Sequence, residues 1–123
     1  MIRELKGKTI LIVDDDPSSL VLFSEIIQPS KAIILCANNG AKTIQFLKTH
    51  FIDLVLLDIQ LPDTDGFSIL NKIKRDFLHM KAIAQTAYSM DIKNECIKAG
   101  FDYCICKPVN AIELMDMINS LLL

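Results

Sequence analysis

The chain has 123 residues, 51% of them hydrophobic, and its 13 Lys and Arg against 15 Asp and Glu give a net charge of −2. This length fits one domain with a substantial core, and the charge provides no basic surface for direct binding of nucleic acid or an anionic membrane. Because the apolar runs are only about four residues long, far below the roughly 20 that span a bilayer, we expect one domain over residues 1–123 and no membrane insertion.

Short aliphatic runs alternate five times with longer amphipathic stretches, and this alternation is typical of β–α units around a parallel sheet. The predicted strands, in chain order, are residues 8–14, 31–37, 53–58, 80–86 and about 102–106. The predicted helices follow them at 17 to about 28, 40 to about 50, 66–78, 90 to about 100 and from 111 onward. Strands that are aliphatic on both faces need helices on both sides, so the sequence predicts an α/β fold with a doubly wound parallel sheet.

Polar residues that favour a helix start precede four of the predicted helices. They are Asp16 before Pro17, Asn39, Ser89, and Asn110 with Glu113 three residues later, which resembles a capping box. Gly100 suits the left-handed position that follows a helix.

Apolar residues at helical spacing predict which side of each helix faces the core. For the second helix they are Ala41, Ile44, Leu47 and the stem of Lys48, and for the third Phe67, Leu70, Ile73 and Phe77. The last helix carries a core stripe of Leu114, Ile118 and Leu121 and a second stripe of Ile112, Met115 and Leu122. The second stripe is expected to be partly buried; if exposed, it would form a docking or dimer surface.

Charged and polar side chains follow four of the five predicted strands. Strand one ends on Asp14, Asp15 and Asp16, strand three on Asp58, strand four on Thr86 and strand five on Lys107. In an open α/β sheet the ligand binds at the carboxyl ends of the strands, so these side chains are expected to converge there. Clustered carboxylates repel one another, and a hard cation such as Mg²⁺ relieves that repulsion.

The same set is complementary to a phosphoryl group, because Lys107 and Thr86 are able to bind phosphoryl oxygens while the metal offsets the acids. Asp58 ends the central strand alone and is the best candidate for a nucleophile that forms an aspartyl-phosphate. Asp16 is explained as a helix cap.

The chain resembles the receiver domain of two-component response regulators from about residue 8 to 122. The motifs that carry the resemblance are ILIVDDDP, DLVLLDIQLPDTDG, AQTA and CKPV, in the family's order and spacing. The resemblance implies a single receiver domain with a flavodoxin-like (βα)5 fold and strand order 2-1-3-4-5. It also implies that Asp58 accepts a phosphoryl group from a phosphohistidine on a histidine kinase or histidine phosphotransfer domain, which is a signalling role and not an enzyme's.

Further site roles follow only from this resemblance. Mg²⁺ or Mn²⁺ would be bound by Asp15, Asp58 and the backbone carbonyl of Gln60, with Asp14 acting through water. Thr86 and Lys107 would hold the phosphoryl oxygens and relay its presence to the face made by the fourth helix, fifth strand and fifth helix. A homodimer through that face stays open. A cis peptide bond is implied at Lys107-Pro108.

The switch positions depart from the family pattern. Where the family usually has an aromatic residue three positions before the lysine, this chain has Cys104, and Tyr103 lies one residue earlier on the opposite face of the strand. A bulge could re-aim Tyr103, but we expect a modified switch without ring rotation. Gln60, Ala87 and Tyr88 are the positions that the resemblance places around the phosphoryl group, where they tune its lifetime.

Three alternatives remain open. Asp14-x-Asp16-x-Ser18 approaches the motif of haloacid dehalogenase-like phosphatases, which would make Asp14 the nucleophile, but Pro17 and the unexplained Asp58 oppose it. A flavin-binding module on the same fold is disfavoured, because the acidic loop after strand one would repel the flavin phosphate. A phosphorylation-independent docking module would keep the fold without the chemistry.

The cysteines and the N-terminus favour a cytoplasmic protein. Cys36, Cys96, Cys104 and Cys106 form no C-x-x-C pair, and unpaired thiols in a reducing compartment pack as small hydrophobic side chains. No small-residue cleavage site follows the first apolar run, so no secretory signal is expected. The lead-in RELKGKTILIVDDD looks like the linker-to-receiver junction of hybrid sensor kinases, which favours an excised module over a stand-alone regulator.

Overall fold

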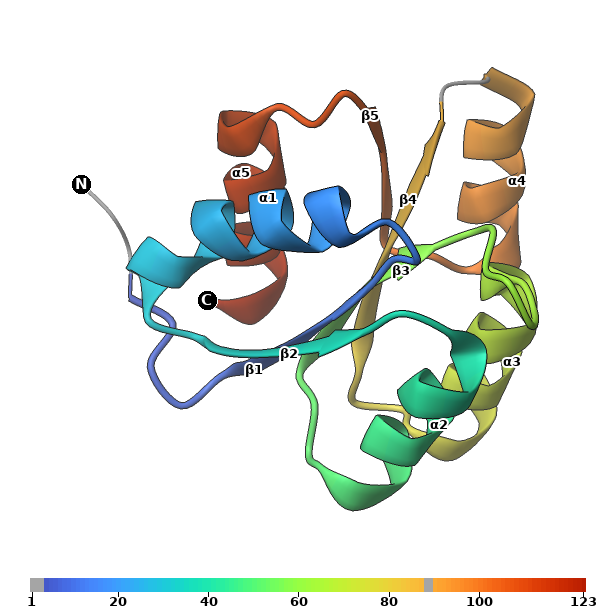
Figure 1. Ribbon diagram of the computed structural model, residues 1–123, viewed down its shortest axis with the longest axis horizontal. Helices are drawn as coiled ribbons and strands as arrows, with labels where there is room; N and C mark the ends of the chain where they lie inside the picture. Colours follow the sequence, from blue (N-terminus) through green and yellow to red (C-terminus); the bar gives the residue numbers. More distant parts are fainter. Residues whose placement is uncertain (1–3, 88–89) are drawn as a thin grey trace.

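The computed structural model describes residues 4–87 and 90–123, in which strands and helices alternate along the chain (Figure 1). The strands are β1 (Thr9–Val13), β2 (Ile33–Ala37), β3 (Leu54–Asp58), β4 (Lys81–Ala87) and β5 (Tyr103–Lys107). The helices are α1 (Pro17–Ile27), a 3-10 turn (Gln28–Ser30), α2 (Gly40–Thr49), α3 (Gly66–Asp76), α4 (Met90–Ala99) and α5 (Ala111–Leu122). All neighbouring strand pairs are parallel, in the order β2-β1-β3-β4-β5, which confirms the flavodoxin-like doubly wound sheet.

Helices cover both faces of the sheet, with α1 and α5 on one side and α2, α3 and α4 on the other (Figure 1). Successive strand residues point to opposite faces, so β1 sends Leu11 and Val13 into the core under α2 and α3, and Ile10 and Ile12 into the core under α1 and α5. The central strand β3 is buried along its whole length. Two apolar cores therefore fix the sheet and leave the strand ends as the polar rim.

Side-chain caps begin the helices largely where the sequence indicated. Asp16, Asn39 and Asn110 accept hydrogen bonds from the backbone N–H groups of Ser18, Lys42 and Glu113 at 2.8–2.9 Å. Gly100 follows α4 with a φ of 113°. Asp65, a cap that the sequence analysis did not single out, accepts from Ser68 at 2.8 Å and begins α3. The expected cap Ser89 lies outside the described residues.

Some sequence-based boundaries and faces were wrong. Residues 31 and 32 do not belong to β2, because Lys31 adopts a left-handed conformation with φ 67° and closes the 3-10 turn that contains Pro29. On α2, Ala41 is exposed at the helix start and Thr43 is buried in its place, with its hydroxyl bound to the backbone of Asn39. The α3 helix ends at Asp76, two residues before the expected end.

The two stripes of α5 differ in burial. Leu114 and Ile118 are fully buried and Leu121 is half-buried, as expected of a core stripe. In the second stripe Ile112 is 75% exposed, whereas Met115 and Leu122 are half-buried against the core. Only the first turn of the second stripe is thus an exposed apolar surface. Within the described part of the chain, no helix has the length and apolarity to cross a membrane.

Candidate functional site

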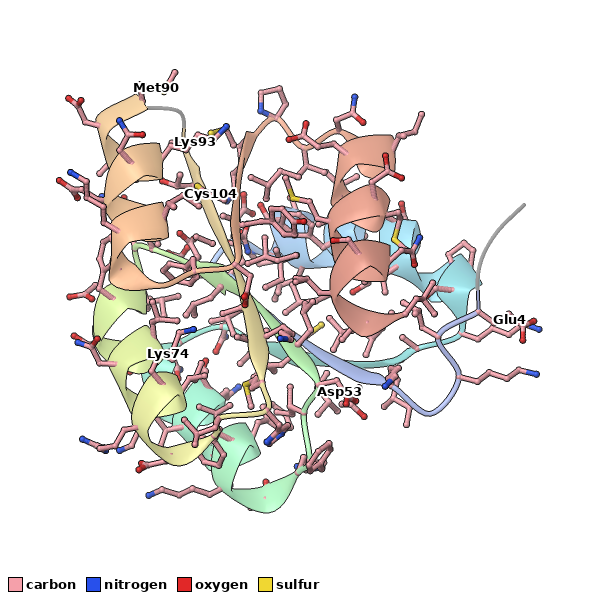
Figure 2. All side chains as sticks on the ribbon, turned by 180° about the vertical axis from the view of Figure 1, so that it is seen from behind. Glu4, Asp53, Lys74, Met90, Lys93 and Cys104 are labelled. Atoms are coloured by element: carbon pink, nitrogen blue, oxygen red, sulfur yellow. The ribbon has the colours of Figure 1, made fainter. Side chains whose placement is uncertain are left out.

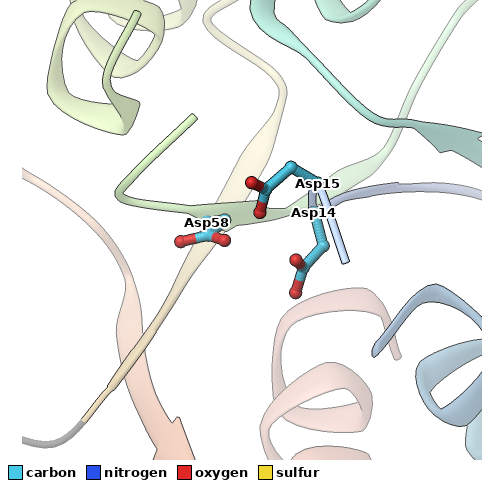
Figure 3. A group of neighbouring side chains, drawn as sticks. All are labelled: Asp14, Asp15 and Asp58. Atoms are coloured by element: carbon cyan, nitrogen blue, oxygen red, sulfur yellow. The ribbon is translucent and has the colours of Figure 1, made fainter. Parts of the chain in front are cut away.

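Three carboxylates lie together at the carboxyl ends of β1 and β3 (Figure 3). These strands are neighbours in the sheet, so Asp14 and Asp15, directly after β1, come close to Asp58 at the end of β3. Each residue offers one carboxylate oxygen, and these oxygens lie within 4.8 Å of one another. Asp14 is fully buried, Asp58 is 8% exposed and Asp15 is exposed.

Lys107 neutralises one of the three acids. Its Nζ donates to Oδ2 of Asp14 at 2.8 Å, and the other carboxylate oxygen of Asp14 accepts from the N–H of Asp16 at 2.9 Å. The pair joins the ends of β1 and β5, the two strands that flank β3 and β4 in the sheet. A fully buried carboxylate requires such a partner, because an unpaired buried charge is strongly destabilising.

Asp58 has no such cation of its own among the described residues. Its Oδ1 accepts from the backbone N–H of Gln60 at 3.0 Å. Burial raises the pKa of the Asp58 carboxyl to about 6; the Gln60 N–H opposes this rise, as does the more distant Lys107, while the charges of Asp14 and Asp15 add to it. Burial, and to a lesser degree the charges of Asp14 and Asp15, therefore disfavours ionised Asp58.

This donor set fits a small, hard divalent cation. Mg²⁺ prefers carboxylate and carbonyl oxygens and usually keeps several waters, and Asp15 and Asp58 present carboxylates at an edge that solvent reaches. A cation would also offset the repulsion from Asp14 and Asp15 that adds to the raised pKa of Asp58. Gln60 lies in the loop after β3, two residues after Asp58, and is exposed.

The remaining site residues lie on β4 and β5. Thr86 is 8% exposed, and its hydroxyl donates to the carbonyl of Ala87 at 3.1 Å. Ala87 is exposed, and Tyr88 lies outside the described residues. The Lys107-Pro108 peptide bond is cis, as the resemblance implies.

Tyr103 and Cys104 point to opposite faces of β5. Tyr103 packs with the core under α5, and its hydroxyl lies 3.0 Å from that of Ser120. Cys104 is buried on the α4 side, and Figure 2 shows it beside that helix. The pairing of β5 with β4 is regular at both residues, so no bulge re-aims Tyr103.

Among the described residues all four cysteines are free thiols, as expected. Burial is the main cause that raises the pKa of Cys104, to about 12. This thiol is therefore protonated and packs as a small apolar side chain.

Glycine is required where the loop after β3 turns into α3. A Cβ on Gly66 would lie 2.8 Å from the carbonyl oxygen of Asp58 and 3.0 Å from the Cα of Ile59. The Gly66 N–H donates to the carbonyl of Ile59 at 2.8 Å. The chain at position 66 thus packs directly against the end of β3, which leaves no room for a side chain. This explains the glycine eight residues after Asp58 in LVLLDIQLPDTDG.

Sequence reasoning missed two residues near the site. Gln85 is fully buried on β4, and its side-chain amide donates to the carbonyl of Val13 at 3.0 Å, which ties β4 to the end of β1. A single amide inside the aliphatic run AIAQTA was the available signal. Asp63 lies in the loop after β3 and binds the start of α2, a contact between distant segments that no local pattern marks.

Comparisons with known proteins show to which family the chain belongs. The family model of the response regulator receiver domain matches residues 10–119. The polar-differentiation response regulator DivK of Brucella anthropi is 31% identical over 118 residues, covering 94% of this chain and 96% of that protein.

Two solved structures are similar over nearly the whole chain. A CheY-like response regulator receiver domain protein from Methanospirillum hungatei JF-1 has 34% identity and a TM-score of 0.85, covering 94% of this chain and 93% of that one. The signal receiver domain of a DNA-binding response regulator from Colwellia psychrerythraea 34H has 28% identity and a TM-score of 0.86, with coverages of 94% and 98%.

Proposed function

Because this chain belongs to the response regulator receiver domain family of two-component signalling, we propose that Asp58 accepts a phosphoryl group from a phosphohistidine. Response regulators receive phosphoryl groups from histidine kinases, directly or through a histidine phosphotransfer domain. In the transfer an Asp58 carboxylate oxygen forms the new bond to phosphorus, the bond from phosphorus to the histidine nitrogen breaks, and that nitrogen keeps the electron pair.

The observation that carries this proposal is the unequal pairing of the two buried acids. Asp14 is fully buried and bound by Lys107 at 2.8 Å, which makes it a poor nucleophile. Asp58 is slightly exposed and accepts only the Gln60 N–H among the contacts described for it. This difference favours Asp58 over Asp14 and so opposes the haloacid dehalogenase-like alternative.

Asp15, Asp58 and the backbone carbonyl of Gln60 would hold Mg²⁺ or Mn²⁺, with Asp14 acting through water. When bound, the metal supplies charge neutralisation that lets a phosphoryl group approach the acids. Thr86 and Lys107 would bind the phosphoryl oxygens, and for this the Thr86 hydroxyl would leave the carbonyl of Ala87. Gln60, Ala87 and Tyr88 would tune the lifetime of the phosphorylated state.

The output surface would be the face made by α4, β5 and α5, with a homodimer through it as one form of output. Cys104 takes the place of the usual aromatic switch residue, and Tyr103 is held on the α5 side. We infer a modified switch, in which Thr86 still contacts the phosphoryl group but no ring rotation follows. Residues 1–123 would form a single cytoplasmic receiver domain that catalyses only its own phosphorylation and dephosphorylation. The domain would act by binding protein partners, and it would bind neither nucleic acid nor membranes directly.

Intact mass spectrometry tests the proposal. Wild type and Asp58→Ala are incubated with a small-molecule phosphodonor, with and without Mg²⁺. We expect one phosphoryl mass on the wild type with Mg²⁺ only, removed by base. Labelling of Asp58→Ala but not Asp14→Ala would instead favour the phosphatase, and no labelling of any form would favour the docking module.

A further inference from the structure

Asp63 lies at the tip of the loop between β3 and α3, outside the acidic cluster. Its Oδ1 accepts from the backbone N–H of Gly40 at 2.7 Å, and its Oδ2 accepts from that of Ala41 at 3.0 Å. Gly40 and Ala41 are the first two residues of α2. One carboxylate thus joins the loop after the proposed phosphoacceptor to a helix more than twenty residues earlier in the chain.

The start of α2 is a strong partner for this carboxylate. The first N–H groups of a helix have no acceptor inside it, and they carry the positive end of the helix dipole. These two hydrogen bonds hold the pKa of Asp63 below its usual value, with Gly40 the larger cause, so the group is charged at neutral pH. Asn39 satisfies a third N–H, that of Lys42, at 2.8 Å.

The loop and the helix also pack directly against each other. A Cβ on Gly40 would collide with the methyl group of Thr64 and would lie 3.1 Å from Oδ1 of Asp63. The backbone of α2 therefore approaches the loop more closely than any other residue type at position 40 would allow. This contact is independent of the carboxylate and holds the same two segments together.

The loop itself is a tight turn, and its internal hydrogen bonds connect the tip of the loop to Gln60. The Leu61 N–H donates to the carbonyl of Thr64 at 3.2 Å, and Gln60 pairs with Asp65 in an antiparallel bridge. Gln60 in turn donates its N–H to Asp58. The turn is thus held at its base by these bonds and at its tip by Asp63, so the contact of the tip with α2 contributes to the position of the Gln60 backbone.

We propose that Asp63 is a positioning residue, which clamps the β3–α3 loop to the start of α2 and so holds the Gln60 carbonyl where a divalent cation binds. This inference rests on the proposed function, since it assumes a cation at Asp15, Asp58 and Gln60. Asp63 touches neither the cation nor the phosphoryl group and acts only through the loop.

The test compares Asp63→Ala with Asn39→Ala, a matched control that removes a different cap from the same helix without touching the loop. Mg²⁺ affinity is measured by isothermal titration calorimetry. Loss of residues that orient a metal ligand typically weakens metal binding 10- to 100-fold. We expect Asp63→Ala to bind Mg²⁺ about tenfold more weakly and Asn39→Ala to stay within about twofold of the wild type. Asp63→Asn, which keeps one acceptor oxygen, should be intermediate.

Two further readouts separate positioning from general destabilisation. With a small-molecule phosphodonor, Asp63→Ala should need about tenfold more Mg²⁺ for half-maximal phosphorylation but reach the wild-type rate at saturating Mg²⁺. Gly40→Ala, which pushes the loop away while favouring the helix, should weaken Mg²⁺ binding in the same direction. If Asp63→Ala and Asn39→Ala bind Mg²⁺ alike, the positioning role is wrong. If the wild type itself neither binds Mg²⁺ nor is phosphorylated, the proposed function fails.

Discussion

Replacing Asp58 with Asn should stabilise the protein at neutral pH. The folded state holds this carboxyl with a pKa of about 6 instead of 3.8, chiefly because it is buried. Since one pKa unit equals about 1.4 kcal/mol, ionising Asp58 in the folded protein costs about 3 kcal/mol of stability. Asn removes the charge and keeps an oxygen for the Gln60 N–H. We therefore expect Asp58→Asn to be more stable by up to about 3 kcal/mol at pH 7.5.

The pH dependence follows from the same shift. An acid whose pKa is raised by folding binds its proton more tightly in the folded state, so the wild type loses stability as the pH rises from about 4 to about 6. Asp58→Asn lacks this loss, and the two proteins should converge near pH 4. Urea unfolding in Mg²⁺-free buffer between pH 4 and 8 measures the difference. Equal stabilities at pH 7.5, or a difference that does not change with pH, would refute the reasoning.

Asp14→Asn is the control with the opposite sign. Asp14 is fully buried but bound by Lys107 at 2.8 Å, so neutralising it leaves the lysine without its partner and should destabilise the protein at pH 7.5. Mg²⁺ provides a second check, because a ligand at ten times its Kd stabilises the folded state by about 1.4 kcal/mol. That gain should appear in the wild type and be largely lost in Asp58→Asn.

Three other changes have distinct expected outcomes. Lys107→Met should lower the free energy of unfolding by about 3 kcal/mol. This value is at the low end for buried ion pairs, because the lysine side chain is a third exposed. Chemical denaturation measures the loss, and an unchanged midpoint would contradict the pairing with Asp14. Gly66→Ala should cost about 1–3 kcal/mol by overpacking, since its Cβ would meet a backbone carbonyl; wild-type stability would show that the loop relaxes freely. Tyr103→Phe should cost about 1 kcal/mol for the lost contact with Ser120 and leave the phosphorylation rate unchanged, whereas a changed rate would place the ring in the switch.

The sequence predicted the fold and the strand-end residues well because both depend on local patterns. Aliphatic runs and caps marked the elements, and the rule that parallel strands deliver their carboxyl ends to one edge brought Asp14, Asp15 and Asp58 together. Asp63 was beyond this reasoning, because an aspartate in LPDTDG is typical of a turn and its partners lie on another helix. The buried face of α2 was misassigned for a different reason: the hydroxyl of Thr43 donates to the carbonyl of Asn39 at the start of the helix, which satisfies this polar group and allows its burial.

The burial and the charge of the site link its cost in stability to its proposed function. Three carboxylates face one lysine, and in this structure that lysine is paired with Asp14. Burial and, after it, the charges of Asp14 and Asp15 raise the pKa of Asp58, so the ionised carboxylate opposes folding. The negative charge of the cluster would also repel a phosphodianion. Pairing Asp58 with a second lysine would relieve both effects but would also mask the carboxylate. A removable divalent cation meets both needs, since it offsets the acids while leaving the Asp58 carboxylate within reach of a phosphoryl group.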